Sequence, residues 1–234
     1  MTTAAATALR DLEQRLRDLQ SAYYDAPAKE EAVILEYLAT LARARALAQG
    51  TAAPVSTRLH LGCGDHRLEG WWNLDLVPSG AVDALVDCAR GLPFPDGAAD
   101  FIHCEDLLEH VERPAGIALL RECFRVLRSG GCLRILTPDL SAIVERVYLG
   151  RDPRHLAWCG RELTASGPCQ ALNMHLRMNG EHRFLYDEAE LSGALAAIGF
   201  SVARVRWNVS EHPELAYLDL RDFGLNLFLE ATRP

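Results

Sequence analysis

Two glycines and a following acid are the residues of this chain best suited to hold a ligand. The segment Leu59–Asp65 is a short apolar run that ends in Gly62-Cys63-Gly64. Glycine has no Cβ, so the backbone there can turn sharply and approach a ligand closely. A second apolar run ends at Asp75, and an acid at the tip of the next strand can accept hydrogen bonds from both ribose hydroxyls. The pattern therefore predicts a nucleoside site on a parallel α/β sheet.

The spacing around these glycines disfavours a dinucleotide such as NAD. The dinucleotide fingerprint requires a third glycine and a long helix, with an acid about 20 residues further on. Here Arg67 occupies the third glycine position, and Asp75 comes too early. Only six residues lie between Gly64 and Trp71, whereas a parallel crossover usually takes about a dozen. We expect a first crossover helix of one turn at most, which offers little support to a pyrophosphate.

S-adenosylmethionine (SAM) carries no phosphate and fits the order of the residues better. Binding it requires a glycine turn for the methionine part, an acid for the ribose, and an acid or amide beside the adenine. Gly62 and Gly64 offer the turn, and Asp75 offers the first acid. Asp87 and Cys88 end the next apolar run and offer a carboxylate and a backbone N–H beside the adenine.

Apolar runs and helical periodicities predict one α/β domain behind a helical segment. Residues 1–50 contain two amphipathic stretches, expected to form a lid, a cover for the sheet or a homodimer surface. Residues 51–234 are expected to form the cofactor-binding domain, with an acceptor-site insertion at 139–183. The predicted strands are 58–61, 71–76, 84–88, 99–104, 132–137, 200–207 and 225–231, and the predicted helices of this domain are 112–127 and 187–198.

Local signals mark the ends of both helices. Ser129-Gly130-Gly131 is interpreted as the stop of the first helix. Asp187 and Glu190 have the spacing of a capping box at the start of the second.

Five short motifs follow one another in order between residues 58 and 139. They are Leu-Gly-Cys-Gly, Asn-Leu-Asp, Leu-Pro-Phe-Pro-Asp-Gly, Leu-Leu-Glu-His-Val and Glu-Cys-Phe-Arg-Val-Leu-Arg-Ser-Gly-Gly. Each alone is weak, but together they make this segment resemble the class I SAM-dependent methyltransferases, the methyltransferase type 11 group in particular. The segment after residue 178 resembles a bacterial subgroup linked to surface sugars or small metabolites.

The resemblance implies a Rossmann-like α/β fold with a seven-stranded, mostly parallel sheet and a shortened first crossover helix. It implies SAM as the cofactor and S-adenosylhomocysteine as its product. The residues expected to contact the cofactor lie at the ends of the first four strands. They are Gly62, Cys63, Gly64, Asp75, Leu76, Asp87, Cys88, Cys104 and Glu105.

Three histidines are the candidates for a general base. His175 and His182 lie in the insertion after the fifth strand, where a fold of this kind forms its acceptor pocket, and His110 follows a short apolar run. We expect methyl transfer to an O atom, with N as the next choice, of a small metabolite, sugar-linked group or peptide in biosynthesis. Two alternatives stay open: a SAM-binding subunit without turnover, and, less favoured, a dinucleotide oxidoreductase.

The composition of the chain argues against several kinds of partner and site. The chain of 234 residues has a formal net charge of −8 and no basic stretch, which argues against a nucleic-acid partner. No apolar run is long enough for a membrane span, and the N-terminus lacks a secretory signal. The seven cysteines form no Cys-x-x-Cys pair, so no metal site is expected, and their odd number fits a reducing cytoplasm.

Overall fold

The computed structural model describes residues 11, 14–15, 57–152, 165–220 and 224–234 of the chain. The predicted N-terminal helices and part of the predicted insertion therefore lie outside the described residues. None of the described helices is long and apolar enough to cross a bilayer.

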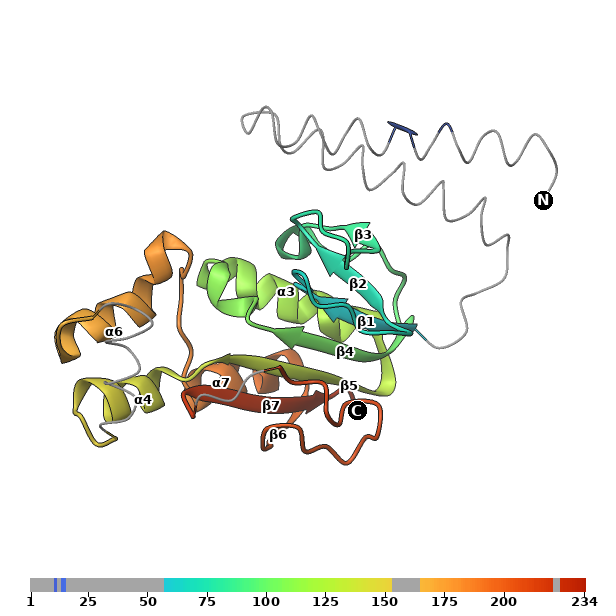
Figure 1. The fold of residues 1–234 in the computed structure, drawn as a ribbon. Helices are drawn as coiled ribbons and strands as arrows, with labels where there is room; N and C mark the ends of the chain where they lie inside the picture. Colours follow the sequence, from blue (N-terminus) through green and yellow to red (C-terminus); the bar gives the residue numbers. More distant parts are fainter. Residues whose placement is uncertain (1–10, 12–13, 16–56, 153–164, 221–223) are drawn as a thin grey trace.

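A single seven-stranded sheet organises the domain (Figure 1), in the order β3-β2-β1-β4-β5-β7-β6. Its strands are β1 (Thr57–Leu61), β2 (Trp72–Asp75), β3 (Ala84–Leu85), β4 (Ala99–Glu105), β5 (Leu127–Pro138), β6 (Ser201–Arg204) and β7 (Asn226–Thr232). The α-helices are α3 (Arg113–Val126), α4 (Leu140–Ala142), α6 (Pro168–Arg177) and α7 (Glu188–Ile198). Short 3-10 helices are η2 (Cys88–Arg90), η3 (Leu108–His110) and η5 (Met178–Gly180), and η4 (Ile143–Tyr148) is a π-helix. Strands β1 to β5 are parallel, and β7 is antiparallel to both of its neighbours, so the predicted fold class is confirmed.

The shortened first crossover is also confirmed. Residues 62–71 contain turns and bends and no helix. Asn73 holds this connection through its side chain: its Oδ1 accepts from the Leu68 backbone N–H at 2.8 Å, and its Nδ2 donates to the Leu68 carbonyl at 3.1 Å. The buried Asn73 amide thus fixes a loop in the place that a crossover helix usually occupies.

Helices α3 and α7 cover one face of the sheet with apolar side chains. In α3, Leu119, Leu120, Cys123 and Val126 are buried, which places one stripe of the helix against the strands. Helix α7 begins as predicted, because the Asp187 carboxylate accepts from the backbone N–H of residue 190 at 2.8 Å. This face belongs to one apolar core that runs from β1 to β7.

The prediction that Ser129-Gly130-Gly131 ends the first helix is wrong. Helix α3 ends at Val126, and β5 begins directly afterwards at Leu127. The glycines lie within β5, where the pairing with β4 jumps by several residues, as in a bulge. A Cβ at Gly131 would lie 2.9 Å from the Arg128 carbonyl oxygen and 3.0 Å from that of Asp100. The glycine therefore permits two backbones to approach.

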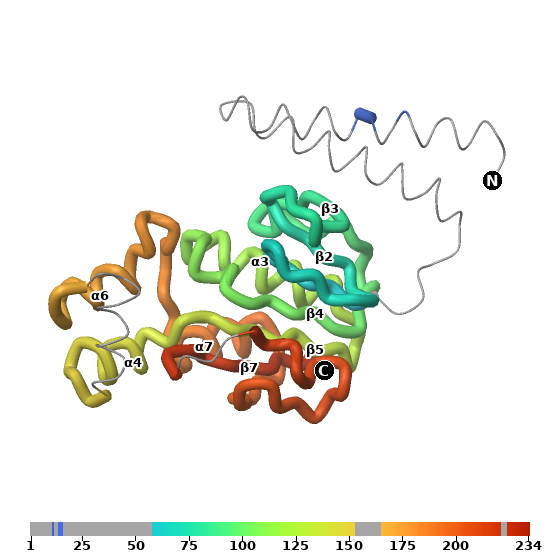
Figure 2. The backbone as a smooth tube through the Cα atoms, viewed as in Figure 1, coloured from blue at the N-terminus to red at the C-terminus, as the bar shows by residue number. Residues whose placement is uncertain are grey.

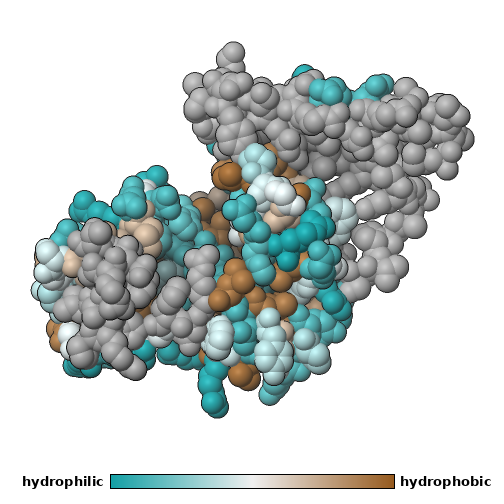
Figure 3. Space-filling view, in the orientation of Figure 1, coloured by the Kyte–Doolittle hydropathy of each residue, from teal (hydrophilic) through white to brown (hydrophobic). Residues whose placement is uncertain are grey.

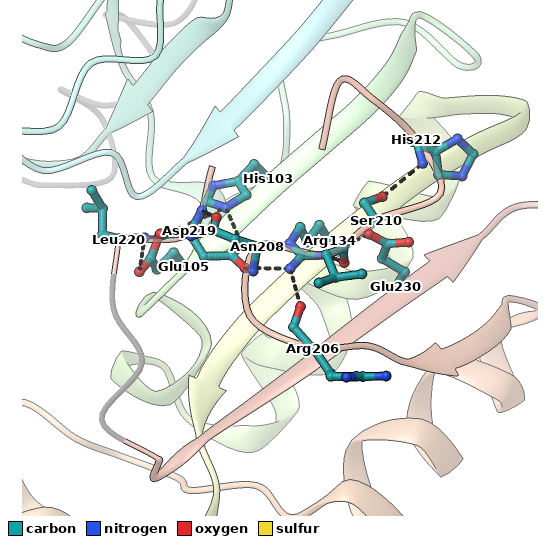
Figure 4. A network of polar contacts seen from close by, with 11 residues as sticks. His103, Glu105, Arg134, Arg206, Asn208, Ser210, His212, Asp219, Leu220 and Glu230 are labelled. Atoms are coloured by element: carbon teal, nitrogen blue, oxygen red, sulfur yellow. Dashed lines mark hydrogen bonds and ion pairs between the residues drawn. The ribbon is translucent and has the colours of Figure 1, made fainter. Parts of the chain in front are cut away.

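The other face of the sheet carries buried polar side chains beneath the segment 205–220 (Figure 4). Arg134 on β5 is fully buried; its Nε donates to Asp219 Oδ1 at 2.6 Å, and its Nη1 donates to Glu230 Oε1 at 2.7 Å. Its Nη2 also donates to Asp219 Oδ2, and the carbonyl oxygens of Arg206 and Val209 accept further bonds at 3.0 Å. We call Arg134, Asp219 and Glu230 the ionic network.

Burial and hydrogen bonding act in opposite directions on this network. Burial is the largest influence on Asp219 and would raise its pKa, but bonds from Arg134 and His103 outweigh it and lower that pKa to about 2. Next to the network, burial lowers the pKa of His60 to about 4, and the nearby His103 adds to the shift. The acid is therefore held charged and the His60 imidazole neutral.

A separate lobe follows β5. Helices α4 and α6 lie together at one end of the sheet, on the left in Figures 1 and 2. Ile143, Val147 and Ala171 form the centre of a second apolar cluster there. The lobe begins directly after Pro138, so it stands beside the carboxyl end of β5.

Candidate active site

The carboxyl ends of four parallel strands meet at one edge of the sheet. Leu61, the last residue of β1, pairs with Leu74 on β2 and with Cys104 on β4. The residues that follow each of these positions, Gly62, Asp75 and Glu105, therefore leave the sheet at the same level. This is the edge at which open α/β sheets bind their ligands.

The glycine turn requires glycine at two positions for different reasons. Gly62 has φ +68°, and a Cβ there would lie 2.9 Å from Leu107 Cβ, so the turn accommodates the segment that follows β4. Gly64 has φ +52°, and a Cβ there would meet no atom of the described residues within 4 Å. The backbone at Gly64 thus borders open space, as a cofactor site requires.

Asp75 lies across this turn. Its Oδ2 accepts from the Gly64 N–H at 2.7 Å, and its Oδ1 accepts from the Val77 N–H at 2.7 Å. A carboxylate has about four acceptor positions, so two bonds leave capacity for a pair of ribose hydroxyls. The two backbone bonds fix the carboxylate at the open side of the turn, which fits the expected role.

Asp87 and Glu105 make protein contacts in this structure. Asp87 caps η2: its Oδ1 accepts from the Ala89 N–H at 3.1 Å, and its Oδ2 lies 3.1 Å from Arg90 Nε. Glu105 is buried, and both of its carboxylate oxygens accept from the backbone N–H of Leu220 at 3.1 Å. Strand alternation explains this position, since Glu105 shares the polar face with His103. The contacts of both acids with the cofactor stay predictions.

The other predicted cofactor residues are near the same edge. Cys63, Cys88 and Cys104 are buried, and Leu76 is partly exposed. Burial, followed by the charge of Asp75, raises the pKa of the Cys63 thiol to about 12. Burial likewise raises the pKa values of Cys88 and Cys104 above the usual range. These thiols are protonated at neutral pH and are therefore poor nucleophiles, and their contacts with the cofactor stay predictions.

A cavity of about 400 Å³ opens beyond the ends of β4 and β5. All three predicted histidines line it, although they come from η3, from α6 and from the segment after η5. The described residues that line it are Asp106, Glu109, His110, Pro138, Ile143, His175, Met178, Glu181, His182, Leu225 and Asn226. In Figure 3, apolar atoms come to the surface in the middle of the visible face, between the lobe and the β1–β3 side of the molecule.

Backbone bonds bring His182 next to His110. The Arg183 N–H donates to the Glu109 carbonyl oxygen at 2.7 Å, which ties the segment after η5 to η3. The two imidazole rings meet edge to face with centroids 5.1 Å apart. His182 Nδ1 lies 2.6 Å from the carbonyl oxygen of His175. Burial, with a smaller effect of His110, lowers the pKa of His182.

Glu109 is the cavity residue that sequence reasoning missed. Its side chain is buried, and its Oε2 accepts from Thr137 Oγ1 at 3.0 Å. The motif Leu-Leu-Glu-His-Val contained the signal, since an acid and a histidine follow one another after an apolar pair. Its neighbour Asp106 also lines the cavity and has φ +49°, a left-handed conformation that is uncommon for a residue other than glycine.

The strand order and the glycine turn together define the class I SAM-dependent methyltransferase fold. Residues 36–205 match the family described as "Methyltransferase domain". The match covers more than half of the chain, so the protein belongs to this family and its cofactor is SAM. The resemblance inferred from the motifs is confirmed.

Solved structures with a similar fold are distant in sequence. A SAM-dependent methyltransferase from Archaeoglobus fulgidus shares 14% identity at a TM-score of 0.48, over 82% of this chain and 93% of that one. One from Mesorhizobium loti shares 18% identity at a TM-score of 0.46, over 80% and 94% of the two chains. An O-methyltransferase family protein from Burkholderia thailandensis shares 15% identity at a TM-score of 0.46, over 98% of this chain and 70% of that one. No curated protein sequence matches this chain.

Proposed function

We propose that this protein transfers the methyl group of SAM to an oxygen atom, or a nitrogen atom, of a small metabolite, sugar-linked group or peptide in a biosynthetic reaction. One observation carries the proposal: three imidazoles from distant parts of the chain line one cavity next to the cofactor edge. A cavity of about 400 Å³ is in the range that small-molecule sites occupy.

The segment 106–110 connects the two parts of the site. Leu107 packs on Gly62, while Asp106, Glu109 and His110 line the cavity. An acceptor in the cavity is therefore separated from the glycine turn by one short piece of chain. Holding two reactants in line in this way provides a large part of catalysis in group transfer.

SAM supplies a methyl group on a positively charged sulfur. The residues of this chain do the rest: the glycine turn and Asp75 orient the cofactor, and the cavity positions the acceptor and limits the access of water. A neutral imidazole of His110 or His182 can accept the proton of an acceptor hydroxyl, a contribution typically worth about 10²–10⁴-fold in rate. A nitrogen acceptor that is already unprotonated needs only the positioning.

The experiment compares cofactor binding with turnover. Calorimetry with SAM, S-adenosylhomocysteine and NAD should show binding of the first two. Asp75→Ala should weaken SAM binding by tenfold or more, about 1.4 kcal/mol. Asp65→Ala, which alters an exposed acid on the same turn, is the matched control and should leave the dissociation constant unchanged. Binding of NAD without SAM would refute the proposal.

Turnover is measured as formation of S-adenosylhomocysteine with panels of hydroxyl, amine and sugar-linked acceptors. His182→Gln should lower kcat and leave the dissociation constant of SAM unchanged, because His182 lines the acceptor cavity. SAM binding without product from any acceptor would instead support a cofactor-binding subunit that lacks turnover.

A further inference from the structure

We propose that Glu109, His110 and His182 form a site for a divalent transition-metal ion inside the acceptor cavity. One carboxylate oxygen and one nitrogen of each imidazole lie within 4.8 Å of one another. The proposal rests on the proposed function, because it gives the acceptor cavity a way to hold its substrate.

The donor set is suited to such an ion. Two imidazoles and one carboxylate on one side of an ion leave the other coordination positions open. Ligand atoms about 2.1 Å from a common ion stand roughly 3–3.5 Å apart. The proposal therefore requires the three ligand atoms, now within 4.8 Å of one another, to move closer together when the ion binds.

Contacts around two of the three ligands, His182 and Glu109, orient them. A carbonyl oxygen can only accept, so His182 Nδ1 donates its proton to the His175 carbonyl, 2.6 Å away. This fixes the tautomer in which His182 Nε2 carries the lone pair. Thr137 Oγ1 donates to Glu109 Oε2 at 3.0 Å and holds the carboxylate. Outer contacts of this kind are typical of metal-binding histidines and carboxylates.

A second group in the protein shows what a non-metal arrangement looks like. Among the described residues, Cys132, His212 and Glu230 also bring their potential ligand atoms within 4.8 Å of one another. Glu230 Oε1, however, accepts from Arg134 Nη1 at 2.7 Å. A guanidinium is always charged and repels a cation, so this group is structural. Among the residues that the structure describes, the lining of the acceptor cavity contains no arginine or lysine.

The ion defines a class of acceptor. With two or more open positions, it binds a hydroxyl oxygen together with a neighbouring oxygen of the same molecule, as in a vicinal diol or a hydroxy acid. Coordination lowers the pKa of the hydroxyl, which then loses its proton to solvent, because His110 and His182 hold the ion and do not act as bases while it is bound. The oxygen lone pair then forms the O–CH₃ bond, the S–CH₃ bond breaks with its electrons on sulfur, and the ion keeps its oxidation state.

The test titrates the full metal-stripped chain with Mn²⁺ and, separately, with Co²⁺, in the absence of SAM and acceptor. Saturable binding at a single site is expected. The electron paramagnetic resonance signal of free Mn²⁺ measures this binding. The Co²⁺ spectrum should show d–d bands without a thiolate charge-transfer band, since no cysteine is a ligand. His182→Gln and Glu109→Gln should each weaken binding by tenfold or more.

His212→Gln is the matched control, because it removes an imidazole from the second group. It should leave the Mn²⁺ dissociation constant unchanged. No saturable Mn²⁺ binding by the wild type, or a loss caused by His212→Gln and not by the other two, would overturn the proposal. Melting curves and the SAM dissociation constant confirm that each variant is folded. Metal binding without methyl transfer would refute the proposed function and leave the metal site standing.

Discussion

The two faces of the central sheet are covered by different kinds of structure. On one face, α3 and α7 bury leucine, valine and cysteine side chains against the strands. On the other, loops cover buried histidines and the ionic network of Arg134, Asp219 and Glu230. A helix satisfies its own backbone bonds, whereas a loop must find partners for its N–H and C=O groups. Asn73 satisfies backbone groups of the connection that replaces the crossover helix, and Arg134 satisfies carbonyl groups of the segment 205–220, so polar side chains are buried on that face.

The comparison predicts the largest effect at Arg134. Arg134→Met leaves Asp219 and Glu230 buried without their cation, and we expect the free energy of unfolding to fall by about 3–5 kcal/mol. Arg134→Met/Asp219→Asn/Glu230→Gln should recover part of this loss, because the uncompensated charges are gone. Urea denaturation measures both. A loss below about 1 kcal/mol for Arg134→Met would show that the polar face does not depend on the network.

The next effect concerns acid, which should lower the stability of the protein through the polar face of the sheet. The pKa of His60 is about 4 in the folded protein, against 6.5 for an ordinary histidine. The unfolded chain therefore binds more protons between these pH values, and stability falls as the pH decreases from 6.5 to 4, by at most about 3 kcal/mol from this residue. His60→Asn, which keeps a donor toward Asn73 but cannot titrate, should flatten this dependence.

The apolar face supplies the control for the acid effect. Leu120→Ala on α3 creates a cavity and should lower stability by about 2–5 kcal/mol. Because no charge is involved, the loss should be the same at pH 7 and at pH 5. A pH-dependent loss for Leu120→Ala, or an unchanged slope for His60→Asn, would remove the distinction between the faces.

The smallest effect concerns the fit of α3 against Tyr186. A Cβ at Gly116 would lie 2.6 Å from Tyr186 Oη, so Gly116→Ala should cost about 1–3 kcal/mol through overpacking. Tyr186 Oη is buried and has no hydrogen-bond partner in the part of the chain that the structure describes, so Tyr186→Phe alone should be close to neutral. The double variant Gly116→Ala/Tyr186→Phe should recover most of the loss. Equal losses with and without Tyr186→Phe would refute this contact.

Features that depend on neighbouring residues were predictable from the sequence. The six-residue gap after Gly64 predicted a first crossover helix of one turn at most, and Asp187 caps α7 as its spacing indicated. Ser129-Gly130-Gly131 shows where local reasoning ends. The same glycines can end a helix or form a bulge within a strand. Only the approach of β4 to β5 decides between these two structures.

The candidate site depends on contacts between distant residues. His110 and His182 were identified as separate candidates, and nothing in their spacing indicated that their rings would lie 5.1 Å apart. Glu109 was missed because the sequence alone does not show that its carboxylate lies beside His110 and His182 in one cavity. Glu105 was expected to contact the cofactor. In this structure its carboxylate accepts a hydrogen bond from the backbone N–H of Leu220, which is 115 positions away in the sequence.

The ionic network also has a consequence for the order in which the chain folds. Arg134 and Glu230 are 96 positions apart in the sequence, and Arg134 and Asp219 are 85 apart. During synthesis, β5 leaves the ribosome well before either acid, so its buried arginine has no counter-ion until the last part of the domain is made. Contacts of such long sequence separation form late and slow folding. The centre of the sheet therefore becomes stable only when the C-terminal strand pairs with it.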